Sequence, residues 1–338
     1  MAISSTSYPP KWSEKTKVIR VPKSLSEDLL RLAELADSFP QFREDLRTML
    51  AQPRRKVVYT SKKEINVSSV PQRSPFRYPG GKTWLIPHIR DWLKSKKTRP
   101  SRLIEPFAGG AIVSLTTAFE GLAKHAVFCE LDPHVAALWR VVLNGQSEWL
   151  VQKILTFEVN EENVRAELGR DAQQLRDEAF KTILRNRVQR GGIMAPGAGL
   201  IKTGEANRGL KARWYPETLA NRIREINERK DRMTFVEGDA FKLIEEHAQD
   251  ADSVFYVDPP YTVAAKRLYS NWEVDHQALF KTLGNCQGDF LMSYDNTSEV
   301  QEMARKHGFQ FKPVAMKSTH HEKKTELLIS TDLGWLKS

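Results

Sequence analysis

Short apolar runs rich in β-branched and aromatic residues alternate along most of the chain with stretches in which apolar residues recur every three or four positions. The first pattern predicts strands, and the second predicts helices that pack on a core by one face. The alternation is regular from Pro75 onward, and after a long interruption it resumes near Met233. The strand and helix pairs read SRLIEPF with GAIVSLTTAFEGLA, HAVFCEL with PHVAALWRVVLNG, DSVFYVDPP with DHQALFKTLGNC, and GDFLMSYDN with SEVQEMARKHGF. This order predicts an α/β fold of Rossmann-like type, with a mostly parallel sheet covered by helices on both faces.

The run VFYVDPPY differs from the other strands, because four apolar residues lead directly into an acid, two prolines and an aromatic ring. A continuous apolar run predicts a strand that is buried on both faces, as in a parallel sheet. Asp258 and Pro259 must end this strand, since proline cannot donate a hydrogen bond to the ladder. In open α/β sheets ligands bind beyond the carboxyl ends of the strands, so this junction is a candidate site.

Residues 147–232 interrupt the alternation, and we expect them to form an insertion in a catalytic domain made of residues 75–146 and 233–338. The first half is charged and helical in spacing, whereas the stretch from Arg185 to Arg213 is rich in glycine and carries seven basic residues against one acid, Glu205. A solvated surface insertion would explain this composition, but phosphate contact explains it better, because arginines on a glycine-rich loop can approach a nucleic-acid backbone. The candidate DNA-binding residues are Arg185, Arg187, Arg190, Lys202, Arg208, Lys211 and Arg213.

Residues 1–74 form a basic extension that ends in a linker rich in Ser, Val and Lys. A short strand is expected at Val18–Val21, followed by a helix that a capping box of Ser24 and Glu27 opens, and a second helix begins near Pro40. Strand, helix and helix in this order are similar to a ribbon-helix-helix DNA-binding module. The alternative is a helical attachment that packs on the main domain.

Composition narrows the class of protein. The 338 residues are 40% hydrophobic and carry a net charge of +10, which predicts a packed globular protein with a polyanionic partner. The two cysteines, Cys129 and Cys286, form no CxxC or Cys/His cluster, so neither a disulfide framework nor a metal site is expected. No apolar run of 18 residues occurs, which indicates a cytoplasmic protein rather than a membrane protein.

Glycines and acids follow the predicted strands. FRYPGGKTW is not a P-loop, because Phe76 stands where that motif needs its first glycine. In EPFAGGA a strand leads into Gly109 and Gly110 and then a helix, so backbone N–H groups can approach a ligand there. Glu130 and Asp132 follow the next strand, where an acid binds ribose hydroxyls in nucleotide-binding folds. Asp132 is also expected to cap the next helix. Another strand ends in VEGDAF, where Asp239 could accept from an adenine amine and Phe241 could contact the ring.

The DPPY sequence suits chemistry on an adenine amine. That nitrogen is a poor nucleophile because its lone pair is conjugated with the ring, so a catalyst must accept hydrogen bonds from its N–H groups. The carboxylate of Asp258 and the carbonyl of Pro259 could do so, and the two prolines add no competing N–H donor. Tyr261 offers a ring on which a base taken out of its helix can stack. The structural alternative is a strand end with a helix-capping acid.

Together these motifs resemble those of the D12 class of N6-adenine DNA methyltransferases, over about residues 75–332. FRYPGGK is similar to the segment of this family that binds the methionine part of S-adenosylmethionine, which implies contacts from Tyr78 and Lys82. The resemblance further implies cofactor contacts from Phe107, Ala108, Gly109, Gly110, Glu130, Asp132, Asp239, Phe241 and Asp258. It implies that the catalytic residues are Asp258, Pro259, Pro260 and Tyr261.

The resemblance implies a class I S-adenosylmethionine-dependent methyltransferase that methylates N6 of an adenine flipped from duplex DNA, with residues 147–232 recognising the target. It needs no metal. Its expected partners are double-stranded DNA and, as a candidate, a cognate restriction endonuclease. DNA adenine methyltransferases of the Dam type carry an Asn-x-x-Gly-x-Phe-Asn-x-Pro-x-Gly loop of which only Gly191 and Pro196 match here, so a GATC target is not implied. RNA adenine methylation, cytosine-N4 methylation and a DNA-binding regulator with an inactive domain are the alternatives.

Overall fold

The computed structural model describes residues 26–51, 70–77, 80–192, 198–204, 207–260, 274–317 and 323–336. The chain divides into two compact units, residues 1–64 and 65–338. None of the helices in these described stretches is long and apolar enough to cross a membrane.

The first unit contains two helices, α1 (Ser26–Ser38) and α2 (Pro40–Ala51). Helix α2 begins at Pro40, as predicted. Nε of Arg43 in α2 donates to the carbonyl of Ala36 in α1 at 2.8 Å, which ties the two helices together. The expected strand at Val18–Val21 and Ser24 of the capping box lie outside the described residues, so the ribbon-helix-helix module stays a prediction.

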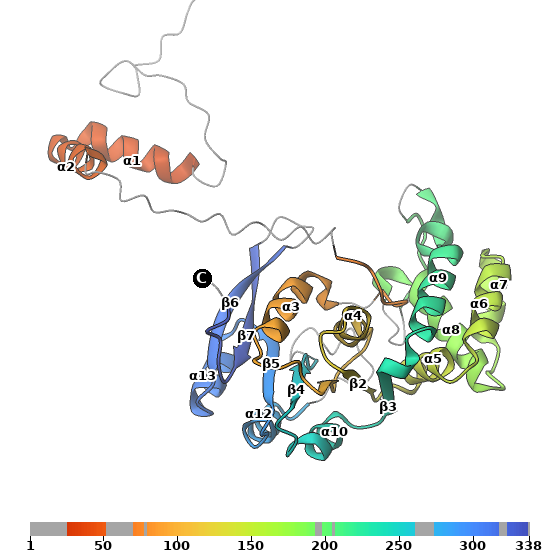
Figure 1. The fold of residues 1–338 in the computed structure, drawn as a ribbon. Coiled ribbons are helices and arrows are strands. Elements are labelled where there is room, and N and C mark those ends of the chain that lie inside the picture. The colour runs from red at the N-terminus through yellow and green to blue at the C-terminus, as the bar shows by residue number, and fades with distance from the viewer. Residues whose placement is uncertain are drawn as a thin grey trace, which may run out of the picture. The chain divides into compact units, whose positions relative to one another are not determined.

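The second unit is built on a seven-stranded sheet in the order β3-β2-β1-β4-β5-β7-β6 (Figure 1). Five strands are parallel, and the last two form an antiparallel hairpin whose strand β7 pairs with β5. The strands are β1 (Arg102–Glu105), β2 (His125–Glu130), β3 (Met233–Glu237), β4 (Ser253–Val257), β5 (Asp289–Asp295), β6 (Gln310–Lys317) and β7 (Lys323–Ser330). The predicted mostly parallel, Rossmann-like fold is confirmed.

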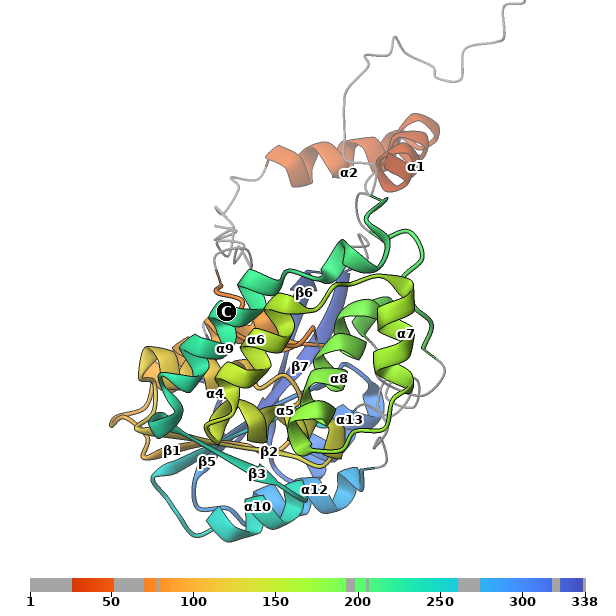
Figure 2. The same ribbon diagram turned by 90° about the vertical axis from the view of Figure 1, so that its right-hand side faces the viewer.

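Helices cover both faces of this sheet, as the pattern predicted. One face is covered by α3 (Ile86–Lys94), α4 (Ile112–Glu120) and α5 (Pro133–Leu143), and the other by α10 (Ala240–His247), α12 (His276–Gly284) and α13 (Ser298–Lys306) (Figures 1 and 2). Every residue of β4 is buried: Val254 and Tyr256 pack in the cluster that contains α3, and Phe255 and Val257 in the one that contains α10 and α12. The apolar part of VFYVDPPY is therefore a central strand.

Residues 147–232 form a helical layer that packs on α5. This layer faces the viewer in Figure 2. Its elements are α6 (Ser147–Thr156), α7 (Glu161–Gly169), α8 (Leu175–Val188), η4 (Arg190–Gly192), η6 (Gly209–Arg213), α9 (Pro216–Asn227) and η7 (Lys230–Arg232). Phe180, Ile183 and Ile223 pack in one apolar cluster with Leu138 and Trp139 of α5. The layer is thus anchored to the sheet through α5.

Candidate active site at the carboxyl edge of the sheet

Asp258 lies directly after β4, at the carboxyl edge of the sheet. Its Oδ1 atom lies 3.0 Å from Nζ of Lys82 and accepts a hydrogen bond of 2.9 Å from the hydroxyl of Ser293, which belongs to β5. The hydroxyls of Ser293 and Tyr256 are hydrogen-bonded at 2.9 Å. Two strands and one helical turn therefore fix this carboxylate, and Pro259, which follows it, is buried.

Lys82 belongs to η3 (Lys82–Leu85) and is only 3% exposed. Its ammonium donates to the carbonyl of Gly80 at 3.2 Å and lies 3.6 Å from Oε2 of Glu326 on β7. Burial by itself would lower the pKa of Lys82, but the two carboxylates outweigh it and raise that pKa above its ordinary value. Lys82 is thus a buried cation shared by Asp258 and Glu326.

Glu326 was not among the residues that the sequence singled out. Burial raises the pKa of its carboxyl to about 7, although Lys82 acts in the opposite direction. The signal for it was present in KKTELLIS, where an acid stands inside an otherwise apolar strand. A buried acid in such a position generally has a partner. Its partner could not be identified, because it lies 244 residues away in the chain.

Glu105, the last residue of β1, is a second buried carboxyl that the sequence did not point to. It is 3% exposed, and its Oε2 accepts a hydrogen bond of 2.7 Å from the backbone N–H of Ser114 in α4. Burial raises its pKa to about 8; the charge of Asp258 adds to this effect and the hydrogen bonds from Ser114 oppose it. Strands β1 and β4 are neighbours at the point where the strand order reverses, where α/β sheets bind ligands.

The glycine turn and Glu130 lie together, one strand further along the edge. The backbone N–H of Gly109 donates to Oε2 of Glu130 at 3.0 Å, and the N–H groups of Leu131 and Asp132 donate to its Oε1 at 2.9 Å. Gly109 has a φ of 50°, a left-handed conformation that favours glycine. Burial raises the pKa of Glu130 to about 7.

The predicted neighbours of Gly109 lie in the same turn. Ala108 donates its N–H to the carbonyl of Cys129 at 3.0 Å, which joins the turn to β2. Phe107 is partly buried against the core on the α10 side of the sheet, and Gly110 is buried. Residues 107–110 thus form the turn that connects β1 to α4.

Asp132 and Asp239 both cap helices. The carboxylate of Asp132 accepts from the N–H of His134 at the start of α5, as predicted, and that of Asp239 accepts from Phe241 and Lys242 at the start of α10. Phe241 is partly buried beside Asp239. The cofactor contacts predicted for these residues remain predictions.

The basic residues of the insertion separate into exposed and buried ones. Arg190, Lys202, Arg208 and Lys211 are exposed, and Arg185 and Arg213 are partly buried. The guanidinium of Arg208 lies over the ring of Tyr215, 5.3 Å from its centroid. Arg187 instead is 4% exposed and donates from Nη2 to the carbonyl of Pro75. Burial in this position gives Arg187 a structural contact that the sequence did not predict.

Two predicted site residues, Tyr78 and Tyr261, lie outside the described residues. Within the described ranges, no group of three or more His, Cys, Asp or Glu side chains could hold a metal ion. The parts of the candidate site that the structure describes are the acids, Lys82 and the glycine turn.

Comparison with known proteins gives one family and a set of distant folds. The model of the D12 class N6 adenine-specific DNA methyltransferases matches residues 78–320. No curated protein matches the chain. The solved structures similar to it include an rRNA methyltransferase from Streptomyces viridochromogenes, at 12% identity and a TM-score of 0.36, covering 80% of this chain and 94% of that one. A SAM-dependent methyltransferase from Agrobacterium tumefaciens matches at 10% identity and a TM-score of 0.35, covering 74% and 62% of the two chains.

Proposed function

The chain belongs to the D12 class N6 adenine-specific DNA methyltransferase family, and we propose that it methylates the exocyclic amine of an adenine in duplex DNA. It is a methyltransferase whose cofactor is S-adenosylmethionine. The observation that carries the proposal is the position of Asp258, which is held by Lys82 and Ser293 at the end of β4 and is followed by two residues without an N–H donor.

The residues at the glycine turn fit the cofactor. An ionised carboxylate offers about four acceptor positions, and three backbone N–H groups occupy three of those on Glu130. A ribose hydroxyl can use the remaining one, beside the N-terminus of α4. S-adenosylmethionine supplies the methyl group on a sulfonium, whose sulfur is a good leaving group.

Asp258 orients the nucleophile in this proposal. Its carboxylate and the carbonyl of Pro259 accept hydrogen bonds from the adenine N–H groups and turn the lone pair of the nitrogen toward the methyl carbon. The bound cofactor would supply the methyl group there, while Asp258 and the Pro259 carbonyl would hold the amine until its surplus proton passes to water. Positioning of this kind accounts for most of the acceleration.

Lys82 and Glu326 set the charge of the acceptor. A carboxylate paired with an ammonium is a weaker acceptor for an amine, because the cation draws on the same lone pairs. When Glu326 is ionised it shares the charge of Lys82, so that Asp258 accepts from the adenine more strongly. Glu326 is therefore proposed as a positioning residue.

The positive charge of the chain supports a nucleic-acid substrate. The insertion carries the exposed cations Arg190, Lys202, Arg208 and Lys211, which suit contacts to DNA phosphates. We propose that residues 147–232 bind the target and that Tyr261 stacks on the flipped base.

A methylation assay tests the proposal. The purified protein is incubated with labelled S-adenosylmethionine and duplex DNA, single-stranded DNA or RNA of one sequence pool, and the products are digested to nucleosides. The expected label is N6-methyladenine, with duplex DNA as the preferred substrate. Label in cytosine or only in RNA, or cofactor binding without any methylated DNA, would contradict it. Asp258→Asn serves as the inactive control.

A further inference from the structure

Residues 74–77 are held by the helices of the insertion. Asn186 of α8 accepts a hydrogen bond from the backbone N–H of Arg77 at 2.9 Å and donates to the carbonyl of Arg77 at 3.0 Å. The side chain of Asn186 is fully buried, and it also donates to the carbonyl of Gly192 at 3.0 Å. One amide group therefore binds both polar groups of the backbone at Arg77.

The contact between η4 and this segment is close enough to need a glycine. A Cβ atom on Gly192 would lie 2.5 Å from the carbonyl oxygen of Arg77, about 1 Å closer than an ordinary contact. Gly192 is itself tied to the end of α8, because its N–H donates to the carbonyl of Gln189 at 3.2 Å and its carbonyl accepts from Asn186. A side chain at this position would therefore displace the segment that contains Arg77.

The chain runs from this segment to the acid site within five residues. Lys82 follows Arg77 by that number of positions, and its Nζ lies 3.0 Å from Oδ1 of Asp258. An extended chain spans at most about 3.6 Å per residue, so the Cα atoms of Arg77 and Lys82 are no more than about 18 Å apart. A displacement of the backbone at Arg77 therefore reaches Lys82 through a short connection.

A second contact joins the segment to the glycine turn. The ring of Phe76 packs edge to face against Trp139, with ring centroids 5.8 Å apart. Trp139 is fully buried, and its indole N–H donates to the carbonyl of Gly109 at 2.9 Å. Residues 74–77 thus connect the insertion with both parts of the candidate active site.

We propose that Asn186 and Gly192 are positioning residues for methyl transfer. They hold the backbone at Arg77, and this keeps Lys82 in contact with Asp258. The inference rests on the proposed function, because it takes Asp258 to be the acceptor that orients the adenine amine. Neither residue touches the cofactor or the base; both act through Lys82, which is one of the groups that fix the carboxylate of Asp258.

Chemical labelling of lysines tests the position of Lys82 without cofactor or DNA. Gly192→Ala adds the clashing Cβ atom. Gly145→Ala is the matched control, because Gly145 also has a positive φ, 84°, but a Cβ atom there would meet nothing within 4 Å. Each protein is treated briefly with acetic anhydride, and acetylation is measured by mass spectrometry. Lys181 of α8, which is 8% exposed, is the internal reference for general opening of the fold.

Gly192→Ala should raise the acetylation of Lys82 several-fold relative to that of Lys181. Gly145→Ala should leave this ratio at its wild-type value. Asn186→Asp keeps the acceptor of the side chain but loses both of its N–H donations, so it should change the ratio in the same direction as Gly192→Ala. If Lys82 stays as protected as in the wild type, or if Lys82 and Lys181 become reactive together, the two residues only stabilise the fold and the inference is wrong.

The kinetics of methylation test the consequence for the reaction. At saturating duplex DNA and S-adenosylmethionine, kcat of Gly192→Ala should fall by about 10–100-fold, because a misplacement of about 1 Å can cost about 10²-fold. This loss outweighs any gain in acceptor strength when Lys82 moves away from Asp258. KM for DNA should change little, and Gly145→Ala should match the wild type in both constants. A raised KM with an unchanged kcat would mean that Gly192 only shapes the DNA-binding surface, which would overturn the inference.

The two experiments separate this inference from the proposed function. If Gly192→Ala exposes Lys82 but the wild type methylates no nucleoside, the positioning of Lys82 stands and the reaction does not. If duplex DNA is methylated while Gly192→Ala behaves like Gly145→Ala in both experiments, the reaction stands and the positioning role does not.

Discussion

Two aspartates at opposite ends of neighbouring strands make similar contacts in different settings. Asp258 follows the carboxyl end of β4, and Asp289 begins β5 at the other edge of the sheet. Each is paired with one lysine and receives a hydrogen bond from a hydroxyl group. Only Asp258 lies at the edge where ligands bind in this type of sheet.

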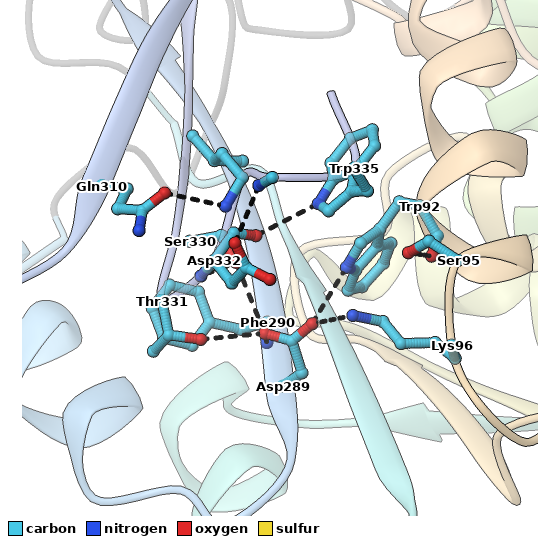
Figure 3. Close-up of polar contacts among 12 residues, drawn as sticks. Trp92, Ser95, Lys96, Asp289, Phe290, Gln310, Ser330, Thr331, Asp332 and Trp335 are labelled. Atoms are coloured by element: carbon cyan, nitrogen blue, oxygen red, sulfur yellow. Dashed lines mark hydrogen bonds and ion pairs between the residues drawn. The ribbon is translucent and has the colours of Figure 1, made fainter. Parts of the chain in front are cut away.

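Asp289 connects several elements of the fold through its hydrogen bonds and its ion pair (Figure 3). Its carboxylate accepts from the indole of Trp92 at 3.1 Å, from the hydroxyl of Thr331 at 3.1 Å and from the N–H of Phe290 at 2.8 Å, and it pairs with Lys96. Trp92 belongs to α3, Lys96 follows that helix, and Thr331 follows β7, so one acid ties a helix and a second strand to β5. Around Asp258 the neighbours are instead other acids with raised pKa values and two prolines. The comparison separates an acid that holds the fold from one that we propose is placed for chemistry.

The largest effect is expected from Asp258→Asn. The amide of asparagine is a weaker acceptor than a carboxylate, so kcat should fall by about 10²–10³-fold or more. The unfolding temperature should change little, because Lys82 keeps Glu326 as its partner. Single-turnover methylation and thermal unfolding measure the two quantities on one preparation. A variant that unfolds instead would make Asp258 structural, like Asp289.

Asp289→Asn should show the opposite pattern. Hydrogen bonds to a charged group contribute about 1.5–3 kcal/mol, and the variant weakens several of them, so the free energy of unfolding should fall by roughly that amount. Methyl transfer per folded molecule should be unchanged. Urea unfolding gives the first result and active-site titration the second. A loss of kcat without a loss of stability would end the distinction between the two edges.

Glu326→Gln should alter the pH profile rather than the fold. In the wild type, Glu326 ionises near pH 7, shares the charge of Lys82 and leaves Asp258 a better acceptor, so kcat should rise several-fold as pH increases through 7. The variant cannot ionise and should lack this inflection. The measurement is the profile of kcat between pH 5.5 and 8.5, a range that spans the pKa of Glu326 near 7. The same inflection in both proteins would exclude Glu326 as its source.

Glu105→Gln should change stability in a way that depends on pH. The pKa of Glu105 rises from 4.5 to about 8 on folding, so the stability that its neutral form provides is present below pH 4.5 and is lost as pH rises toward 8. Glutamine stays neutral and keeps an acceptor for Ser114. The variant should match the wild type at low pH and become the more stable of the two as pH rises. Denaturant unfolding at several pH values checks this, and a constant difference would contradict the raised pKa.

The sequence predicted what depends on local pattern. The apolar run before Asp258 marked a strand covered on both sides, and the residues after the strands marked the functional edge. Asp132 was correctly expected to cap a helix. Each of these features is set by neighbours in the chain.

Contacts between distant segments could not be predicted in this way. The resemblance assigned Lys82 to the cofactor, which stays a prediction, but its ion pairs with Asp258 and Glu326, on strands far along the chain, could not be predicted. Arg187 stands among charged residues, which predicts an exposed side chain. In the structure its guanidinium instead donates to the carbonyl of Pro75. Pairing and burial of this kind depend on how the elements pack, which no local pattern contains.

The most direct test of the central claim is nucleoside analysis of duplex DNA after reaction with labelled S-adenosylmethionine. The wild type and Asp258→Asn are compared in parallel at equal concentrations of folded protein. The wild type should place the label in N6-methyladenine, and Asp258→Asn should place at least about 10²-fold less there. Equal labelling by both proteins, or label in any other nucleoside, would contradict the account.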